Sequence, residues 1–429
     1  MAMAMAMVKS TQERLVVKGK DRTIAGTLGS RWTYLSRASV AAGTITLALG
    51  AGYDRFAASS PEAIFRKSTD VVLLKSFYEQ AVVDGVSDAK AQLKWRRLAK
   101  AIIRQKPLSA SGMRLLAFSG NGSHLCCSGL IRLSSRVSRR DLGTHLWNIE
   151  NSVSKQDVVG ALHHYDLALL TSNDDARKLL FSKLVSALGD PKIDEALQLY
   201  IRHNSNWLVP FVEFALVDGS VSLPLAELVR KSGGFTESPK FEELNARLLD
   251  QLVATGHYEA ARTFYLSLSG AEATRLTSLS LDSKFLRQPF GSLDWRLNEA
   301  ASFGANFSGS GNSQNTLAIF ANSGSRGVVA SKVLFLSPGT YALSVRLGPG
   351  QLPHQAALRW SLSCLSPSKA GTVWSLEKGQ QGIQTEIRAL IDVLDTCAFQ
   401  RFELSIIDGA GQTGSFAEII SMELRPNRN

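Results

Sequence analysis

The stretch VVASKVLFLSPGTYALSVRL (residues 328–347) alternates apolar side chains with small or polar ones on both sides of a Pro-Gly pair. A period of two places successive side chains on opposite faces of an extended chain, which is the pattern of a half-buried β-strand. Pro338 and Gly339 are typical turn residues. The stretch therefore predicts two antiparallel strands joined by a tight turn.

The alternation of apolar and polar residues continues on both sides of this hairpin. Further strand-like runs lie at 315–321, 357–365, 372–378, 401–408 and 417–424. About seven short strands favour an antiparallel β-sandwich of the jelly-roll kind, which we place at residues 285–429. The run LSPGTYALSVRL also resembles a strand–turn–strand segment of carbohydrate-binding sandwich modules, and that resemblance implies a glycan ligand.

Residues 59–281 follow helical spacing instead. Apolar residues recur every three or four positions in VVLLKSFYEQAVV (71–83), AQLKWRRLAKAII (91–103) and FEELNARLLDQLVA (241–254), and short breaks rich in Gly, Pro, Asn and Asp separate such segments. Helices of this length, joined by tight turns with no strand between them, predict antiparallel helix pairs. The chain is thus expected to be a multidomain α plus β protein.

Two helical segments, 246–265 and 145–169, resemble tetratricopeptide repeats. Each combines apolar residues on a first helix with a small residue where a second helix packs closely and an aromatic that fills the groove. The residues in these packing roles are Trp147, Ala161, Tyr165, Gly256, Ala261 and Tyr265. Repeats of this type usually bind other proteins, so the resemblance implies protein partners.

The N-terminus combines a basic tail with an apolar segment. Residues 1–37 contain seven Lys or Arg against two acidic residues, and the following Ala38–Tyr53 stretch is 16 residues without a charge. With flanking aromatics we extend this segment to 38–56, although a full span needs about 20 residues. Three interpretations stay open: a single-pass anchor, a cleaved signal peptide, or a glycine-rich buried element of a cytosolic protein. In the first two, the basic flank favours a cytoplasmic tail and an exported remainder.

The composition excludes several classes of protein. A hydrophobic fraction of 45% and a single apolar segment argue against a disordered chain and a polytopic transporter. The net charge is +11. We do not expect a nucleic-acid partner, because the cations are not interleaved with aromatics on one helix face and no zinc-finger or RNP-type motif is present.

The 429 residues include four cysteines, too few for a disulfide-dense scaffold. Cys364 ends one predicted strand and Cys397 precedes another, so the two are natural disulfide partners if the domain is exported. The bond would close a loop of about 34 residues and contribute about 3–4 kcal/mol. The alternative is a pair of buried free thiols. Adjacent Cys126 and Cys127 are interpreted as small apolar packing residues of a helix.

The sequence offers no catalytic or cofactor motif. Phosphate-binding loops, a GxSxG elbow and an HExxH zinc motif are all absent. His163 and His164 would point about 100° apart on a helix and cannot chelate one ion together. The paired carboxylates of a glycosidase cannot be located from sequence, because they meet only in space. We therefore expect no cofactor, no metal and no catalytic residues.

Three tryptophans in the predicted sandwich are candidates for a sugar-stacking platform: Trp295, Trp360 and Trp374. An aromatic face stacked on a sugar ring, with polar groups nearby, is the usual arrangement in lectin-type recognition. The competing interpretation is that these side chains form the core. It is strongest for Trp360, which shares strand parity with Leu358 and Cys364.

The chain as a whole resembles a group of proteins encoded with exopolysaccharide biosynthesis in sphingomonad-type bacteria. The matching features are the basic N-terminus with one membrane segment, the repeat-like stretch at 139–170, and a terminal sandwich that opens with PFGSLDWRL (289–297). The sandwich also carries the pattern Trp360, Cys364, Trp374, Cys397, Gln400. The resemblance spans nearly the whole chain. It implies a periplasm-facing accessory protein and supplies no catalytic residues.

These patterns lead to one functional expectation with two alternatives. We expect a non-enzymatic, single-pass inner-membrane protein whose bulk lies in the periplasm. Its helical repeats would bind envelope or polysaccharide-export proteins, and its sandwich would contact exopolysaccharide or another subunit. The first alternative is a polysaccharide hydrolase or lyase with the sandwich as a targeting module. The second is a structural envelope protein that binds no glycan.

Overall fold

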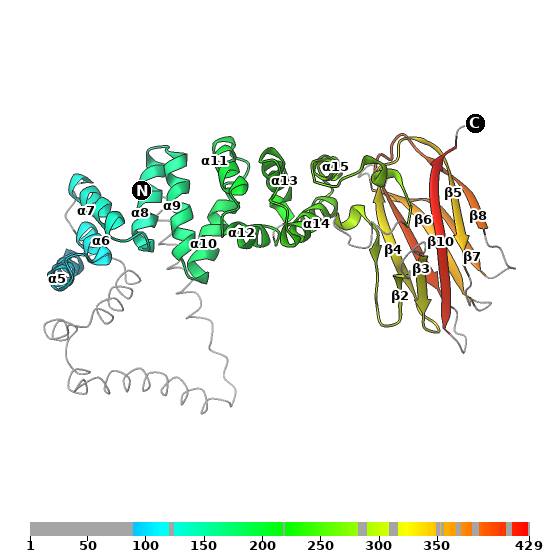
Figure 1. Cartoon of the computed structure of the whole chain (residues 1–429), viewed down its shortest axis with the longest axis horizontal. Coiled ribbons are helices and arrows are strands. Elements are labelled where there is room, and N and C mark those ends of the chain that lie inside the picture. The colour runs from blue at the N-terminus through cyan, green and yellow to red at the C-terminus, as the bar shows by residue number, and fades with distance from the viewer. Residues whose placement is uncertain are drawn as a thin grey trace, which may run out of the picture. The chain divides into compact units, whose positions relative to one another are not determined.

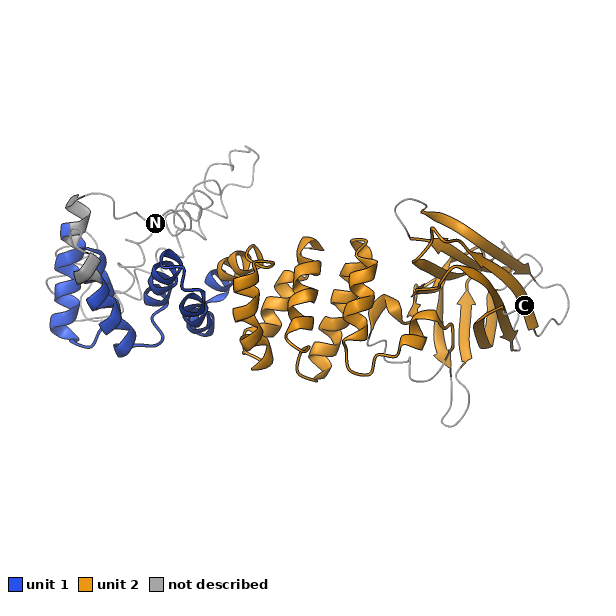
Figure 2. Ribbon diagram, turned by 90° about the horizontal axis from the view of Figure 1, so that it is seen from above, with its two compact units in different colours: residues 1–177 blue, residues 178–429 orange. Residues whose placement is uncertain are grey.

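The computed structural model describes residues 89–119, 124–217, 219–281, 290–308, 316–348, 352, 356–365, 370–379, 386–408 and 414–427. The basic tail and the predicted membrane segment at 38–56 lie outside the described residues. The chain divides into two compact units, residues 1–177 and 178–429 (Figure 2). This division falls inside the region 59–281 that we predicted as helical, so its last helices share a unit with the sandwich.

The described part of the first unit is helical (Figure 1). Its helices are α5 (Ala89–Gln105), α6 (Ala110–Phe118), α7 (His124–Val137), α8 (Leu142–Ser154) and α9 (Val158–Thr171), and α10 (Asp174–Val185) spans the division. The Ser109, Asp141 and Asp157 side chains accept hydrogen bonds from backbone N–H groups in the first turns of α6, α8 and α9. These caps satisfy donors that the helices cannot, and so fix where each begins.

One buried ion pair ties α6 to the start of α8. Arg114 Nε donates to Asp141 Oδ2 at 2.6 Å and Arg114 Nη2 donates to Asp141 Oδ1 at 3.2 Å. Burial alone would raise the pKa of Asp141, but the hydrogen bonds and charge of Arg114, together with hydrogen bonds from Thr144, hold it below its usual value. The carboxylate thus serves as helix cap and as counter-ion at once.

The second unit begins with a helical layer. Its elements after α10 are α11 (Pro191–Arg202), α12 (Leu208–Ala215), η2 (Gly219–Val221), α13 (Ser222–Lys231), α14 (Pro239–Ala254), α15 (Tyr258–Leu266), η3 (Ala273–Thr277) and η5 (Gly291–Leu293). Among the described residues, no single helix is both long and apolar enough to cross a membrane. Leu208–Ala215 and Gly219–Lys231 meet the length and composition criteria only as a pair bent by 111°.

The predicted antiparallel β-sandwich is confirmed. Its strands are β1 (Arg296–Leu297), β2 (Phe303–Ser308), β3 (Thr316–Ala321), β4 (Arg326–Leu334), β5 (Gly339–Leu347), β6 (Ala357–Cys364), β7 (Gly371–Gly379), β8 (Glu386–Val393), β9 (Gln400–Ile407) and β10 (Ser415–Pro426). One sheet has the order β1-β4-β9-β6-β7 and the other β2-β3-β10-β5-β8, with antiparallel pairs throughout (Figure 1). Alternate residues of both sheets meet in one core, as the period of two requires.

The predicted disulfide between Cys364 and Cys397 is present and closes one end of the sandwich. Gln400, directly opposite Cys364 on β9, is fully buried beside it. Its side chain accepts from Leu336 N at 2.9 Å and donates to the carbonyls of Leu336 and Cys397. Every polar atom of this buried amide is therefore satisfied, and three chain segments are joined at the end of the sheet.

The linker between helices and sandwich inserts into the sandwich core. Leu279, Leu281 and Trp295 belong to the same apolar cluster as the strands. Trp295 Nε1 donates to Ser280 O at 3.2 Å, and Phe335 N donates to Leu276 O at 2.8 Å. The helical layer and the sandwich are thus parts of one packed unit.

A buried charged cluster lies at this junction. Asp294 is fully buried, and its Oδ1 lies 3.7 Å from Arg275 Nη1. Lys332 projects from β4 and donates to Ser278 O at 2.9 Å. Burial raises the pKa of Asp294, although the positive charges of Lys332 and Arg275 act to lower it. Burial also lowers the pKa of Lys332, to about 8. Asp294 is thus a buried counter-charge to both cations, and the two cations in turn favour its charged form.

We expect the substitution Asp294→Ala to destabilise the second unit by about 3–5 kcal/mol, because it removes a buried negative charge that opposes the charges of Lys332 and Arg275. Urea unfolding followed by tryptophan fluorescence measures this. Glu299→Ala removes an exposed carboxylate a few residues away, and we expect it to change stability by less than about 0.5 kcal/mol. Equal effects of the two substitutions would refute this role for Asp294.

Candidate functional site

Two of the three candidate tryptophans cannot contact a ligand. Trp295 and Trp360 are 0% exposed and belong to the sandwich core, where Trp295 packs edge-to-face against Phe402. Trp374 lies on the edge strand β7, opposite Leu362, and packs half-buried against the same core. The interpretation of Trp295 and Trp360 as a sugar platform is therefore wrong, because both point between the sheets rather than out of them.

The repeat-like positions are all in packed helices or their turns. Gly256 has φ +78°, a conformation that few other residues adopt, and it ends α14 before the turn into α15. Ala261 and Tyr265 are buried on α15, and Ala161 is buried on α9. Trp147 and Tyr165 are half-buried on α8 and α9. These placements fit packing roles, while the assignment to tetratricopeptide repeats stays a prediction.

The adjacent His163 and His164 lie beside a third histidine, His145, which the sequence did not indicate. His145 on α8 is buried, and its Nδ1 lies 3.4 Å from His164 Nδ1 on α9. His145 Nε2 lies 2.9 Å from Arg139 O, so we assign the proton of His145 to Nε2 and the shared proton to His164. Burial and the neighbouring His163 and His145 lower the pKa of His164 to about 4. His164 is therefore neutral at pH 7 and joins α9 to α8 through its contact with His145.

No metal centre is evident in the described residues. No group of three or more His, Cys, Asp or Glu side chains there is arranged to hold an ion. Cys126 and Cys127 lie in α7, and their side chains lie outside the described part of the structure.

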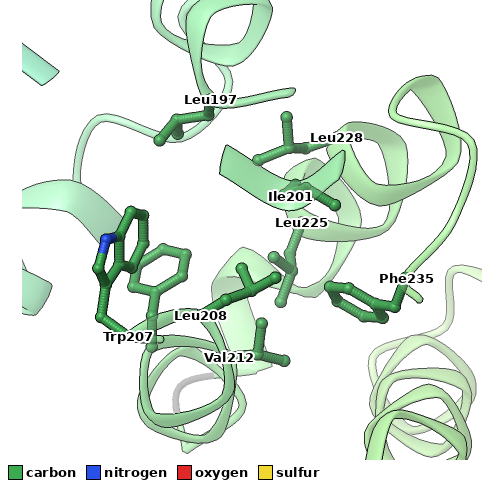
Figure 3. Close-up of a pocket in the computed structure, with 9 residues that line it drawn as sticks. Leu197, Ile201, Trp207, Leu208, Val212, Leu225, Leu228 and Phe235 are labelled. Carbon is green, nitrogen blue, oxygen red and sulfur yellow. The ribbon is translucent and has the colours of Figure 1, made fainter. Parts of the chain in front are cut away.

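A small cavity between α11, α12 and α13 is apolar (Figure 3). Leu197, Trp207, Leu208 and Phe235 are among the side chains around it, and its volume is about 10 Å³. A space of this size holds at most about one water, and apolar cavities stay dry. It is a packing defect of the helical core rather than a ligand site.

The outer face of the β2-β3-β10-β5-β8 sheet carries an exposed aromatic pair. Phe320 on β3 lies directly opposite Phe416 on β10, and the two are 36% and 43% exposed. Gly304 lies next to Phe320 on β2, and a Cβ there would meet the Phe320 ring at 2.9 Å. The glycine thus leaves room for the ring to lie against the sheet.

Polar side chains lie beside this pair on the same face of the sheet, two residues along the strands. Ala318 is flanked by Asn306 on β2 and Glu418 on β10, and Asn306 is exposed. Thr316 Oγ1 donates to Glu418 Oε1 at 2.6 Å, which orients the carboxylate. We call Phe320, Phe416, Asn306 and Glu418 the aromatic platform. It presents two apolar rings beside an amide and an oriented carboxylate.

The aromatic platform lies at the end of the sandwich away from the helical layer. The four residues after Ala321 lead directly into β4, which begins at Arg326 and ends at Leu334, beside the junction. At about 3.3 Å per residue, nine residues of strand separate the two ends by roughly 26 Å. A ligand on the platform therefore leaves the junction untouched.

Sequence reasoning missed Phe320 and Phe416 because it weighed tryptophans only. A signal was present in each strand. In TLAIFA, Phe320 is in phase with Thr316 and Ala318, and in SFAEII, Phe416 is in phase with Glu418. An aromatic on the polar phase of a strand points outward, whereas Trp360 is on the apolar phase.

No family model matches the chain, and no curated protein matches it. Among solved structures, it is similar to TmCBM61 in complex with β-1,4-galactotriose, at 12% identity over 31% of this chain and 88% of that one, with a TM-score of 0.23. It is also similar to a xylan-binding domain from CBM 22, at 13% identity over 32% of this chain and 88% of that one, with a TM-score of 0.23. A third similar structure is the CBM22-1 xylan-binding domain from Paenibacillus barcinonensis Xyn10C, at 11% identity over 36% of this chain and 95% of that one, with a TM-score of 0.22.

We expect the α8–α9 pair to lose stability as the pH falls from 7 to 5. The pKa of His164 is about 4 in the folded chain and about 6.5 when unfolded, so between these values the unfolded state binds more protons. Hydrogen exchange of α8 and α9 amides at pH 7 and pH 5, corrected for intrinsic rates, measures the effect.

The variant His164→Gln should show a much smaller loss over the same pH range, since it lacks the imidazole whose pKa is lowered by folding. His203→Gln removes an exposed histidine of the second unit and should behave like the parent chain. If His164→Gln kept the full pH dependence of α8 and α9, another group would be responsible.

Proposed function

We propose that this chain is a non-enzymatic binding protein of the cell envelope, in which the sandwich binds polysaccharide and the helices hold protein partners. The observation that carries the proposal is the aromatic platform. Two exposed rings on adjacent strands offer a surface for the apolar face of a sugar, and Asn306 and Glu418 offer a donor and acceptors for its hydroxyl groups.

The packing of the sandwich supports a role in binding. A platform on paired strands is held by the backbone ladder on both sides of the contact, and its rings lose little freedom when a ligand binds. Two exposed aromatics that lie directly opposite each other on adjacent strands form a continuous apolar surface, which a single exposed side chain such as Leu390 does not.

The Cys364–Cys397 disulfide supports an envelope location, because such bonds persist in oxidising compartments and are rare in the cytosol. We infer that the apolar segment at 38–56 carries the chain into or across the inner membrane. The bulk then lies in the periplasm, where exopolysaccharide and export proteins are available as partners. Anchoring would raise the effective concentration of both binding modules at an assembly site.

A structural envelope protein is the second candidate, and the junction favours it. The linker inserts Leu279, Leu281 and Trp295 into the sandwich core, and Tyr258 on α15 lies against Phe399 at 5.1 Å between ring centroids. Under this reading the sandwich is built chiefly to pack on its own helices. Glycan binding by the aromatic platform separates the two candidates.

We expect the purified chain to be retarded by polysaccharide in affinity electrophoresis, with xylan, galactan, hydroxyethylcellulose and a bacterial exopolysaccharide as probes. Phe416→Ala or Phe320→Ala should weaken the interaction about ten-fold, since an aromatic contact contributes up to about 1.5 kcal/mol.

The matched control is Leu390→Ala, which removes an exposed apolar side chain from the outer face of β8 in the same sheet. It should bind like the parent. If no probe retarded the parent chain, or if both phenylalanine variants bound normally, the structural candidate would replace this proposal.

Location has its own test. A reporter that is active only in the periplasm, fused after residue 429, should be active in the membrane fraction. Cys364→Ser should then lower the free energy of unfolding of the second unit by about 3–4 kcal/mol. A stable fusion without reporter activity would place the chain in the cytoplasm and remove the envelope assignment.

A further inference from the structure

The positive charge of the chain is concentrated in one helical segment as well as in the tail. Residues 89–140, which contain α5, α6 and α7, hold 12 Lys or Arg and no Asp or Glu. Residues 141–429 hold 25 Lys or Arg against 29 acidic residues. The α5–α7 segment is therefore a strongly cationic body joined to a slightly acidic remainder.

The fold turns these charges outward. Trp95, Leu98, Ala99 and Ile102 form the buried side of α5 and pack with Leu115 of α6. Helix α6 is mostly buried and contacts both α5 and α7. The cations of this segment whose side chains are described, apart from Arg114, are consequently left on the surface. Nine are exposed: Arg96, Arg97, Lys100, Arg104, Lys106, Arg132, Arg136, Arg139 and Arg140.

Little of this charge is neutralised internally. Within the described residues of the first unit, the ion pairs are Arg114–Asp141 and Arg177–Asp174. Arg114 is the buried member of the segment, and Arg177 lies outside it. We call the nine exposed cations the basic surface. It creates a field that attracts anions and weakens as salt is added.

Exposed apolar side chains accompany the basic surface. Leu108 is 77% exposed in the turn between α5 and α6, two residues after Lys106, and Leu93 is 57% exposed on α5. Phe118 and Leu133 are also exposed. Leucines among cations are typical of surfaces that lie in a lipid headgroup layer, where phosphates take the charges and acyl chains take the leucines.

We propose that the α5–α7 segment binds the surface of an anionic phospholipid membrane through the basic surface, with Leu108 entering the headgroup region. A nucleic acid or an acidic polysaccharide would also be attracted by the charges. Neither offers an apolar phase for Leu108 and Leu93, and this difference favours lipid. The inference concerns the first unit and does not depend on glycan binding by the sandwich.

The test is co-sedimentation of the full chain with vesicles of phosphatidylcholine, with and without 30% phosphatidylglycerol, at low and high salt. The triple variant Arg96→Gln, Arg97→Gln, Lys100→Gln should bind the anionic vesicles on the order of 100-fold more weakly, at about five-fold per charge. The expected difference is lost in high salt and on uncharged vesicles.

A matched control removes three exposed cations of the second unit, with Lys178→Gln, Lys192→Gln and Arg230→Gln. It has the same net charge as the first variant and should bind like the parent. A second variant, Arg132→Gln with Arg136→Gln, tests α7 independently of any effect on the folding of α5. The tail at 1–37 and the segment at 38–56 are identical in all these chains.

Leu108→Ser separates lipid from other polyanions. It should weaken binding to anionic vesicles several-fold while leaving the binding of dextran sulfate or duplex DNA unchanged. Normal vesicle binding by both charge variants would overturn the proposal. It would equally be overturned if the charge variants lost dextran sulfate or DNA binding while Leu108→Ser bound vesicles normally.

Discussion

The burial of Asp294 is the constraint on which the second unit depends. A carboxylate without solvent needs charges and donors around it, and here they come from separate segments: Arg275 in η3, Lys332 on β4 and the backbone N–H of Phe290. Because neither the helical layer nor the sandwich contains all of these groups, the cluster is satisfied only when both are in place. A cluster of this kind contributes less to net stability than apolar packing would, but a misplaced linker would leave a buried charge unpaired.

The same end of the sandwich carries a disulfide and a buried amide that join its strands. Leu334, Gln400 and Cys364 share one level of the sheet, with the disulfide and the Gln400 amide beside them. At the opposite end, which carries the aromatic platform, the buried Asp408 joins two further segments: its N–H donates to Ser325 O at 2.9 Å, and Ser415 Oγ donates to its carboxylate. Both ends of the sandwich are thus cross-linked, by a disulfide and a buried amide where the helices dock and by a buried carboxylate beside the platform.

Sequence periodicity was sufficient for the sandwich and for the described helices, because each depends on patterns that recur within a few residues. The disulfide was predicted from the positions of Cys364 and Cys397 beside two strands, and only for an exported domain. It could not locate the junction, since Asp294, Arg275 and Lys332 are ordinary charges until the fold brings them together. The prediction that Trp295 and Trp360 form a sugar platform was wrong for a related reason. Size and aromaticity are shared by core and binding residues, and only strand phase distinguishes Trp360 from Phe320 and Phe416. The His145–His164 contact likewise joins two helices and has no signature in either.

The distribution of charge gives the two proposals different partners. The sandwich at 285–429 is close to neutral, with 12 Lys or Arg against 10 acidic residues, so it exerts only a weak general attraction on a polyanion, and the proposed glycan contact relies on stacking and hydrogen bonds. The cations gather instead in the tail and in α5–α7. Long-range attraction would therefore orient the chain with its first unit towards an anionic surface. Such attraction is screened within about 10 Å in salt, whereas stacking and hydrogen bonds at the platform depend far less on salt. The two proposals thus draw on separate residues: the membrane contact on the cations of α5–α7, and the glycan contact on the aromatic platform of the sandwich.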